Sequence, residues 1–94
     1  MHQEILNALK NKTLIQFDYD NIPRTVEPYC YGKTASGNEA LRGYQTSGEK
    51  NKMAWKLFDL TKASQFQALS DPFKPRKEYK SQGDKVITTI ISQI

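Results

Sequence analysis

Short segments in which apolar and polar residues alternate recur along the chain, and turn-forming residues separate them. Ile15, Phe17 and Tyr19 alternate with polar neighbours, and Asp20 begins a turn. A period of two residues is that of a half-buried β-strand. Four further segments rich in strand-forming residues follow, at residues 24–31, 40–45, 53–60 and 64–69. Their short connections predict a mainly β fold, a small five-stranded barrel of the SH3-like or Sm-like type.

Segments of a different character flank these strands. Ile5, Ala8 and Leu9 fall on one side of a helix that we expect over residues 3–10. In the tail, residues 84–94, apolar residues recur at helical spacing after an aspartate that suits an N-cap. The same residues are mostly β-branched and also suit a strand. Of the two interpretations, the spacing favours the helix.

The length of 94 residues is that of one domain. We expect a barrel over residues 1–80 and a tail over residues 81–94 that packs on the barrel or on a partner. Within the barrel domain, Pro72 and Pro75 each remove a backbone donor. The segment around them is therefore predicted to run over the barrel as an extended strap.

Composition narrows the classes of partner and of site. The net charge of +4 and a pI near 9.2 favour anionic partners. A single cysteine excludes an intramolecular disulfide and a zinc cluster, and we expect no metal and no cofactor. The start of the chain lacks the apolar run of a signal peptide, and no stretch is long and apolar enough to span a bilayer. These features predict a protein of the cytoplasm.

Four basic side chains and one aromatic side chain are the candidate ligand contacts: Arg24, Arg42, Tyr44, Lys56 and Lys62. The planar fork of an arginine donates two parallel hydrogen bonds and so matches a phosphate group. A tyrosine two residues further along the same strand can stack on a base. The alternative interpretation is that these charges form ion pairs with Asp or Glu on a solvated surface.

Four short motifs, in a fixed order, resemble the WYL domain family. They are Arg-Thr-Val-Glu-Pro at residues 24–28, Ala-Leu-Arg-Gly-Tyr at 40–44, Phe-Asp-Leu-Thr-Lys at 58–62 and Phe-Lys-Pro at 73–75. The resemblance covers about residues 3 to 79. Glu39 and Ala40 stand where the family's name-giving Trp and Tyr would be, and Leu41 completes the triplet.

The resemblance implies a Sm/SH3-like barrel that serves as a ligand-sensing module in bacterial transcription regulators and phage-defence systems. Such domains bind nucleic acids or nucleotide-like ligands through basic side chains. That role would fall here on Arg24, Arg42 and Lys62. The sequence shows no DNA-binding domain beside the barrel, so we expect a stand-alone module rather than a complete transcription regulator.

These observations predict a non-enzymatic regulatory module that binds a nucleotide or single-stranded nucleic acid. Catalysis has little support, because the one histidine is at position 2 and no pattern pairs it with Cys30. The alternative is a protein-interaction or oligomerisation module that uses its edge strands and its apolar tail. The two functions are compatible, so a homodimer or a regulatory protein partner is also expected.

Overall fold

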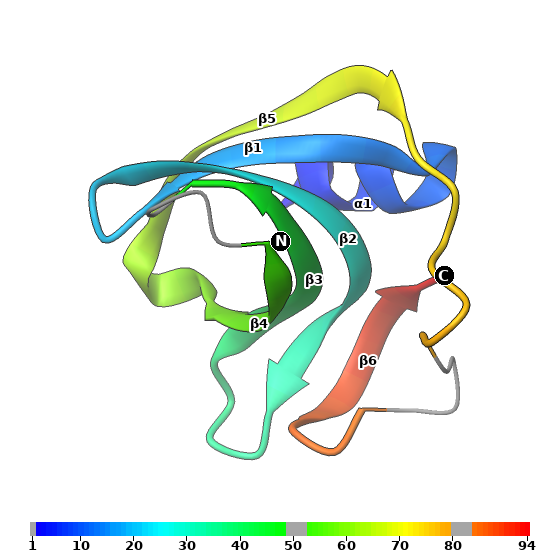
Figure 1. Ribbon diagram of the computed structural model, residues 1–94. Helices are drawn as coiled ribbons and strands as arrows, with labels where there is room; N and C mark the ends of the chain where they lie inside the picture. The colour runs from blue at the N-terminus through cyan, green and yellow to red at the C-terminus, as the bar shows by residue number, and fades with distance from the viewer. Residues whose placement is uncertain (1, 49–52, 80–83) are drawn as a thin grey trace.

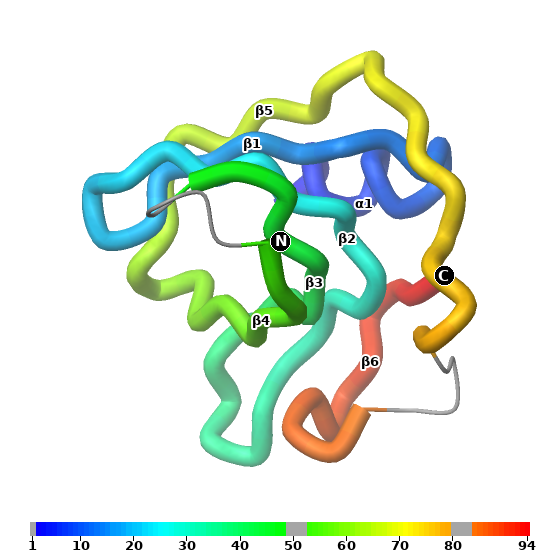
Figure 2. The backbone as a smooth tube through the Cα atoms, viewed as in Figure 1, coloured from blue at the N-terminus to red at the C-terminus, as the bar shows by residue number. Residues whose placement is uncertain are grey.

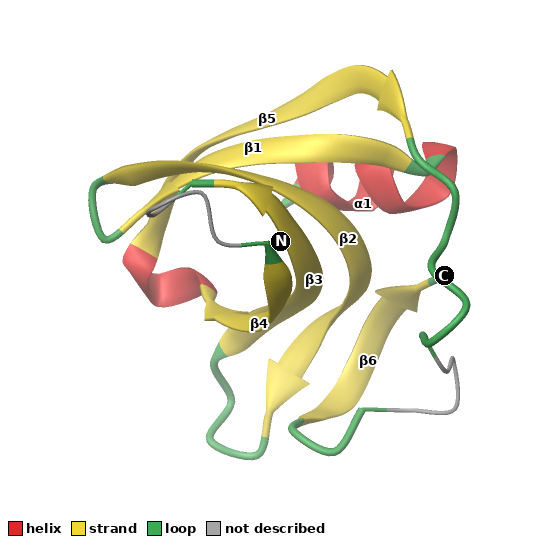
Figure 3. Ribbon diagram, in the orientation of Figure 1, coloured by secondary structure: helices red, strands yellow, loops and turns green. Residues whose placement is uncertain are grey.

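A computed structural model describes residues 2–48, 53–79 and 84–94, and Figure 1 shows their arrangement. The chain begins with a helix, and strands make up most of the remaining residues (Figure 3). The elements in order are α1 Gln3–Asn11, β1 Thr13–Tyr19, β2 Ile22–Thr34, β3 Glu39–Ser47, β4 Ala54–Asp59, the 3₁₀ turn η2 Leu60–Lys62, β5 Ala63–Pro72 and β6 Ile87–Gln93. The expected boundary between barrel and tail, at residues 80–81, lies outside the described residues.

The strands form one antiparallel sheet that curves into a barrel-like shape around the core (Figures 1 and 2). Neighbouring strands follow the order β4-β3-β2-β1-β5, and β6 pairs with β2. This arrangement confirms the mainly β small-barrel class with an N-terminal helix. All five expected strands are present, and β6 adds a sixth.

Strand β2 bends at a proline and changes partner there. Its first half pairs with β1 as far as Val26, and its second half pairs with β6 from Cys30 onward. Pro28 lies between the two halves, where the register with β3 also shifts. Because proline has no backbone N–H, it fits where a ladder is interrupted. Pro28 therefore lies at the bend that separates the two halves of β2.

The preference for a helix in the tail is wrong. Residues 87–93 form β6, whose partners on β2 run from Cys30 to Thr34. That half of β2 would otherwise present unpaired backbone groups on this side, and β-branched isoleucines and threonines pack well on a pleated surface. Gly32 permits the close approach, because a Cβ there would lie 2.0 Å from the carbonyl oxygen of Thr89. Tertiary pairing therefore overrides the helical spacing.

The core lies between the concave side of the sheet and α1. The helix contributes Ile5, Ala8 and Leu9, which fall on one face at intervals of three and four residues, and it packs on β1, β2 and β5. Phe17 and Phe58 meet edge to face with ring centroids 5.0 Å apart. Burying each such side chain contributes roughly 1.5–3 kcal/mol. This apolar packing fixes the barrel wall on which the candidate site residues stand.

Candidate ligand-binding site

The strand pairings divide four of the five candidate residues between two faces of the sheet, and the fifth, Lys62, lies in the turn η2. Arg42 lies opposite Leu57 and Tyr44 opposite Trp55, on the side away from the core. Arg24 lies opposite Phe17, on the side of the core. Side chains directly opposite each other project to the same face, and successive side chains project to opposite faces. The side of β2–β4 that bears Glu27, Tyr29, Arg42, Tyr44 and Trp55 is called the outer face below.

Arg42 already holds a carboxylate. Its Nε lies 2.8 Å from Oδ2 of Asp84, and its second terminal nitrogen lies 3.1 Å from Oδ1. Asp84 also accepts hydrogen bonds from the backbone N–H groups of Val86 and Ile87, just before β6. The Arg42 hydrogen bonds, with these backbone donors, lower the pKa of Asp84 to about 2. Of the two alternatives for Arg42, the ion pair is the state that this structure contains.

Tyr44 forms part of an aromatic surface beside Arg42. Its ring meets the Trp55 ring at a steep angle, with centroids 5.4 Å apart. The guanidinium carbon of Arg76 lies 3.6 Å from the Tyr44 ring centroid. This is a cation–π contact, so an arginine already occupies one face of the ring.

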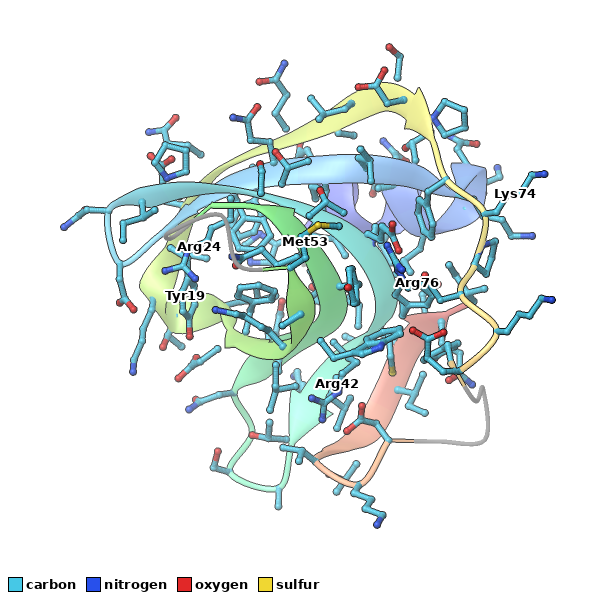
Figure 4. The ribbon with its side chains drawn as sticks, in the orientation of Figure 1. Tyr19, Arg24, Arg42, Met53, Lys74 and Arg76 are labelled. Atoms are coloured by element: carbon cyan, nitrogen blue, oxygen red, sulfur yellow. The ribbon has the colours of Figure 1, made fainter. Side chains whose placement is uncertain are left out.

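The other three candidates lie apart from this pair. Arg24 is 4% exposed and donates to the side chain of Gln45 and to the carbonyl of Tyr19. Figure 4 shows Arg24 beside Tyr19, well away from Arg42. Lys56 lies opposite Gly43 and shares a face of β4 with the buried Phe58, so it projects to the side opposite Arg42 and Tyr44.

Lys62 ends the 3₁₀ turn η2 and is exposed to solvent. It follows Asp59, which caps the turn by accepting hydrogen bonds from the backbone and the hydroxyl of Thr61. The structure thus brings together Arg42 and Tyr44, and it does not bring the five candidates into one site.

The segment at residues 73–79, called the strap below, contacts the outer face through residues that the sequence did not single out as a site. Arg76 donates from Nε to Oε1 of Glu27 at 3.0 Å and from its terminal nitrogen to Oε2 at 3.2 Å. Glu27 also accepts a hydrogen bond of 2.8 Å from the hydroxyl of Tyr29. Burial and the neighbouring Glu27 raise the pKa of Tyr29, so this phenol stays protonated and remains a donor.

The segment after β5 follows the predicted extended course, but of the two prolines only Pro75 lies in the strap, because Pro72 is the last residue of β5. The partnership of Glu27 with Arg76 had no local signal, because the two residues are 49 positions apart. Strand alternation alone puts Glu27 and Tyr29 on one face of β2, but only the pairing of β2 shows that this face lies away from the core. The aromatic residues of the strap were the one sequence signal that it packs on this face, since the rings of Phe73 and Tyr79 both contact the ring of Tyr29.

Cys30 and His2 lie in separate surroundings. Cys30 is buried, and burial together with the charge of Asp84 raises its pKa to about 11, so the thiol is protonated at neutral pH. His2 lies near Glu39, with 3.8 Å between Nε2 and Oε1. Both observations fit structural roles for these two side chains.

Two small hollows adjoin the turn between β2 and β3. Their volumes are about 270 and 200 Å³, and Asn38 and Glu39 border both. None of the five candidate residues lines either hollow. Within residues 2–48, 53–79 and 84–94, no group of three His, Cys, Asp or Glu side chains could hold a metal ion. Among the same residues, no helix has the length and apolar character needed to cross a membrane.

Comparison with solved structures supports the fold. The chain is similar to proteasome accessory factor B/C (PafBC) of Arthrobacter aurescens, with a TM-score of 0.69 and 23% sequence identity. The match covers 84% of this chain and 13% of that protein, so the likeness concerns one part of a much longer chain. At this identity the likeness shows the fold alone, and it is consistent with the WYL-like barrel expected from the sequence. No protein-family model matches the sequence, and no curated protein matches it either.

Proposed function

We propose that this protein is a non-enzymatic regulatory module that binds a nucleotide or single-stranded nucleic acid at its outer face. One observation supports this proposal above the others. The fork of Arg42 and the ring of Tyr44 stand two residues apart on the same side of β3, and Trp55 flanks the ring. A guanidinium next to an aromatic surface offers a hydrogen-bonding partner for phosphate and a stacking partner for a base.

The ion pair of Arg42 fits this function. The carboxylate of Asp84 presents two oxygens to the guanidinium fork, as a phosphate group would. A bound phosphate would therefore replace Asp84 with little rearrangement of Arg42. The release of Asp84 would also withdraw the acceptor from the backbone N–H groups of Val86 and Ile87. Ligand binding would in this way change the hydrogen bonding at the start of β6.

The remaining basic candidates take indirect roles in this proposal. Lys56 and Lys62 contribute positive potential, which raises the rate of encounter with an anionic ligand. Arg24, which is buried, supports the barrel wall through Gln45 and Tyr19. The fold neighbour is named an accessory factor, and that name agrees with a module that acts on a partner rather than on a substrate.

Fluorescence anisotropy with short labelled single-stranded DNA and RNA, at two salt concentrations, tests the proposal. We expect Arg42→Ala to weaken binding about tenfold, because a hydrogen bond to a charged group contributes about 1.5–3 kcal/mol. The salt dependence should fall by about one phosphate contact. Lys10→Ala, which removes an exposed charge on α1, is the matched control.

A second variant makes the test sharper. Asp84→Asn removes the competing carboxylate but keeps an oxygen that can cap Val86, so it should tighten binding of the same oligonucleotides. If Arg42 served only to hold the tail, Asp84→Asn would leave affinity unchanged. Full affinity of a folded Arg42→Ala protein would refute the proposal, as would no binding of nucleotides or oligonucleotides by the wild type at micromolar protein.

A protein-interaction function is the second candidate, and it is supported by the outer edge of β6. Within the described part of the chain β6 pairs with β2 alone, and Val86 and Ile90 are 41% and 36% exposed. Such an edge can accept a strand from another molecule. Deletion of the tail cannot test this idea, because Ile87 is buried against Cys30 and Ala40 and its loss would uncover them. Light scattering of the Ile90→Lys variant can test it. If the wild type associates and the variant has the same mass, the edge of β6 is not the interface.

A further inference from the structure

The outer face contains a buried carboxylate arranged to receive a guanidinium. Glu27 is 7% exposed, and both of its oxygens bond to Arg76. The hydroxyl of Tyr29 donates to the same carboxylate at 2.8 Å, and the backbone N–H of Arg76 donates to that hydroxyl at 3.0 Å. The Tyr44 ring covers the guanidinium at 3.6 Å. Three groups on the barrel therefore converge on one arginine.

The chemistry of this pocket selects arginine over lysine. A buried carboxylate is costly unless a charged partner also satisfies its hydrogen bonds. A guanidinium does so with two parallel N–H groups and stacks flat on a ring, whereas an ammonium group offers a compact point charge. Glu27 and Tyr44 are directly opposite each other on β2 and β3, so the sheet itself sets their spacing.

An aromatic surface, covered by the strap, adjoins the Glu27 carboxylate. The rings of Tyr29 and Trp55 have centroids 4.7 Å apart, and the strap lays Phe73 and Tyr79 on Tyr29. The indole N–H of Trp55 donates to Glu78 at 3.2 Å. The pocket and this aromatic surface together, made by Glu27, Tyr29, Tyr44 and Trp55, are called the arginine groove below.

The strap lies in this groove much as a bound peptide would. Residues 73–76 belong to no helix or strand, and both prolines of Pro72-Phe-Lys-Pro75-Arg76 face solvent. Proline fixes its own backbone and disfavours the helical conformation in the residue before it. The free segment is therefore already restricted, and little conformational entropy is lost on docking. Two hydrogen bonds from backbone N–H groups hold this stretch. The N–H of Phe73 donates to the carbonyl of Lys12, and the N–H of Arg76 donates to the hydroxyl of Tyr29.

We infer that the arginine groove is a docking site for an extended segment of a partner protein in which aromatic residues flank an arginine, as they do in the strap, and that the strap occupies the groove in cis until such a segment displaces it. Charge complementarity identifies the partner, since the buried Glu27 carboxylate requires a cationic fork. The ring of Tyr29 accepts aromatic side chains, as it does those of Phe73 and Tyr79. The inference does not depend on nucleotide binding. The two sites share Tyr44, but their charged anchors differ, Glu27 here and Arg42 there.

A labelled nonapeptide with the sequence of residues 71–79, Asp-Pro-Phe-Lys-Pro-Arg-Lys-Glu-Tyr, tests the inference. The wild-type strap competes at an effective concentration on the order of millimolar, so the wild type should bind the peptide weakly. Arg76→Ala removes the cis arginine and should bind the peptide at least about tenfold more tightly. Adding Glu27→Gln to Arg76→Ala should abolish that gain. Anisotropy measures binding, and the fluorescence of Trp55, the single tryptophan, reports contact with the groove.

Two controls make the result decisive. A peptide with alanine at the Arg76 position should bind the Arg76→Ala protein at least about tenfold more weakly than the native peptide. Arg42→Ala should not change peptide affinity, even if it abolishes binding of single-stranded DNA. Where circular dichroism shows that Arg76→Ala is unfolded, Arg76→Lys takes its place, because it keeps the charge and loses the fork.

Three results would overturn the inference. The first is equal affinity for the native and alanine-substituted peptides. The second is no gain of affinity in either folded Arg76 variant. The third is that Arg76→Ala gains affinity for single-stranded DNA and not for the peptide, and that adding Glu27→Gln removes this DNA binding. Each is distinct from a failure of the nucleotide proposal, which is read from Arg42→Ala and Asp84→Asn.

Discussion

The barrel core and the outer face lie on opposite sides of β2, β3 and β4, and different forces hold them. On the core side, Val26, Leu41 and Phe58 come from these three strands and pack in an apolar cluster. On the outer side, two arginine–carboxylate pairs tie later parts of the chain to the same strands: Arg76 to Glu27, and Arg42 to Asp84. Non-directional burial builds the first region. The second combines directional, charged hydrogen bonds with aromatic packing on Tyr29 and a small apolar cluster around Ile87.

The two regions therefore respond differently to solution conditions. Apolar packing persists across pH and salt, and its loss unfolds the domain. A charged pair at a surface is weakened by salt and by protonation of the acid, so it can be exchanged for another partner without loss of the fold. The outer face is the region in which a ligand or a partner segment can compete with the chain itself.

The largest effect is expected where the core is opened. Phe17→Ala removes a ring that is 1% exposed and packs on both Phe58 and Phe66. The free energy of unfolding should fall by about 3–5 kcal/mol in urea titrations. Ile15→Val, at a neighbouring core position, should cost only about 0.5–1.5 kcal/mol. Similar losses for the two variants would mean that the core is less tightly packed than its buried aromatic contacts indicate.

The next effect concerns pH and Asp84. Its folded pKa of about 2 lies below the ordinary value of 3.8, so its contribution to stability is present above about pH 4 and is lost as the pH falls toward 2. At pH 7 the free energy of unfolding of the wild type should exceed that of Asp84→Asn by on the order of 2 kcal/mol. This difference should close near pH 2. Chemical denaturation across this range measures the difference. A stability difference that persists unchanged at pH 2 would show that it does not arise from the charge of Asp84. Asp71→Asn, at an exposed position, controls for the change in net charge.

Loosening the strap should have a smaller and more local effect. Arg76→Ala should lower the free energy of unfolding by about 1–2 kcal/mol, because Arg76 is partly exposed but the buried Glu27 carboxylate loses its charged partner and keeps the Tyr29 hydroxyl. Hydrogen exchange should rise at the amide of Phe73, which bonds to Lys12, while the amide of Ile15 in β1 keeps its protection. Equal acceleration at both amides would show that strap and barrel open together, contrary to the separation of core and outer face.

The smallest effect is expected at Lys62. This side chain is exposed at the end of η2, and Lys62→Ala should change the free energy of unfolding by less than about 0.5 kcal/mol. Its effect on oligonucleotide affinity should be limited to weaker electrostatic attraction at low salt. A loss of affinity as large as that of Arg42→Ala, persisting at high salt, would show that Lys62 contacts the ligand directly.

Local patterns predicted the barrel because its strands are built from local signals. The alternation around Phe17 and the turn at Asp20 gave β1 and its hairpin to β2, and the apolar face of Ile5 and Leu9 gave α1. These signals agree with the tertiary structure, so no competing interaction overrides them. The tail differs, because its isoleucines satisfy both periods and the second half of β2 decides between them.

The candidate site was predicted less completely, for a physical reason. Arg42 and Tyr44 share a strand face, and their spacing of two residues is visible in the sequence. The partners that determine their state, Asp84 and Arg76, come from distant parts of the chain, and only the folded structure brings them there. Arg24 was misplaced relative to Arg42 because the faces of two strands can be compared only when their register is known.

The double partnership of β2 has a consequence for synthesis of the protein. β1, β2 and β3 leave the ribosome well before β6, so they can pair while β6 is still being made. During that interval the β6-facing edge of β2, from Cys30 to Thr34, has no strand to cover it. An open edge in a newly made chain is a place where another strand can attach, and chaperones protect such species. Closing the sheet thus depends on the last strand to arrive, and the rate of that step sets how long the nascent domain is exposed to misassembly.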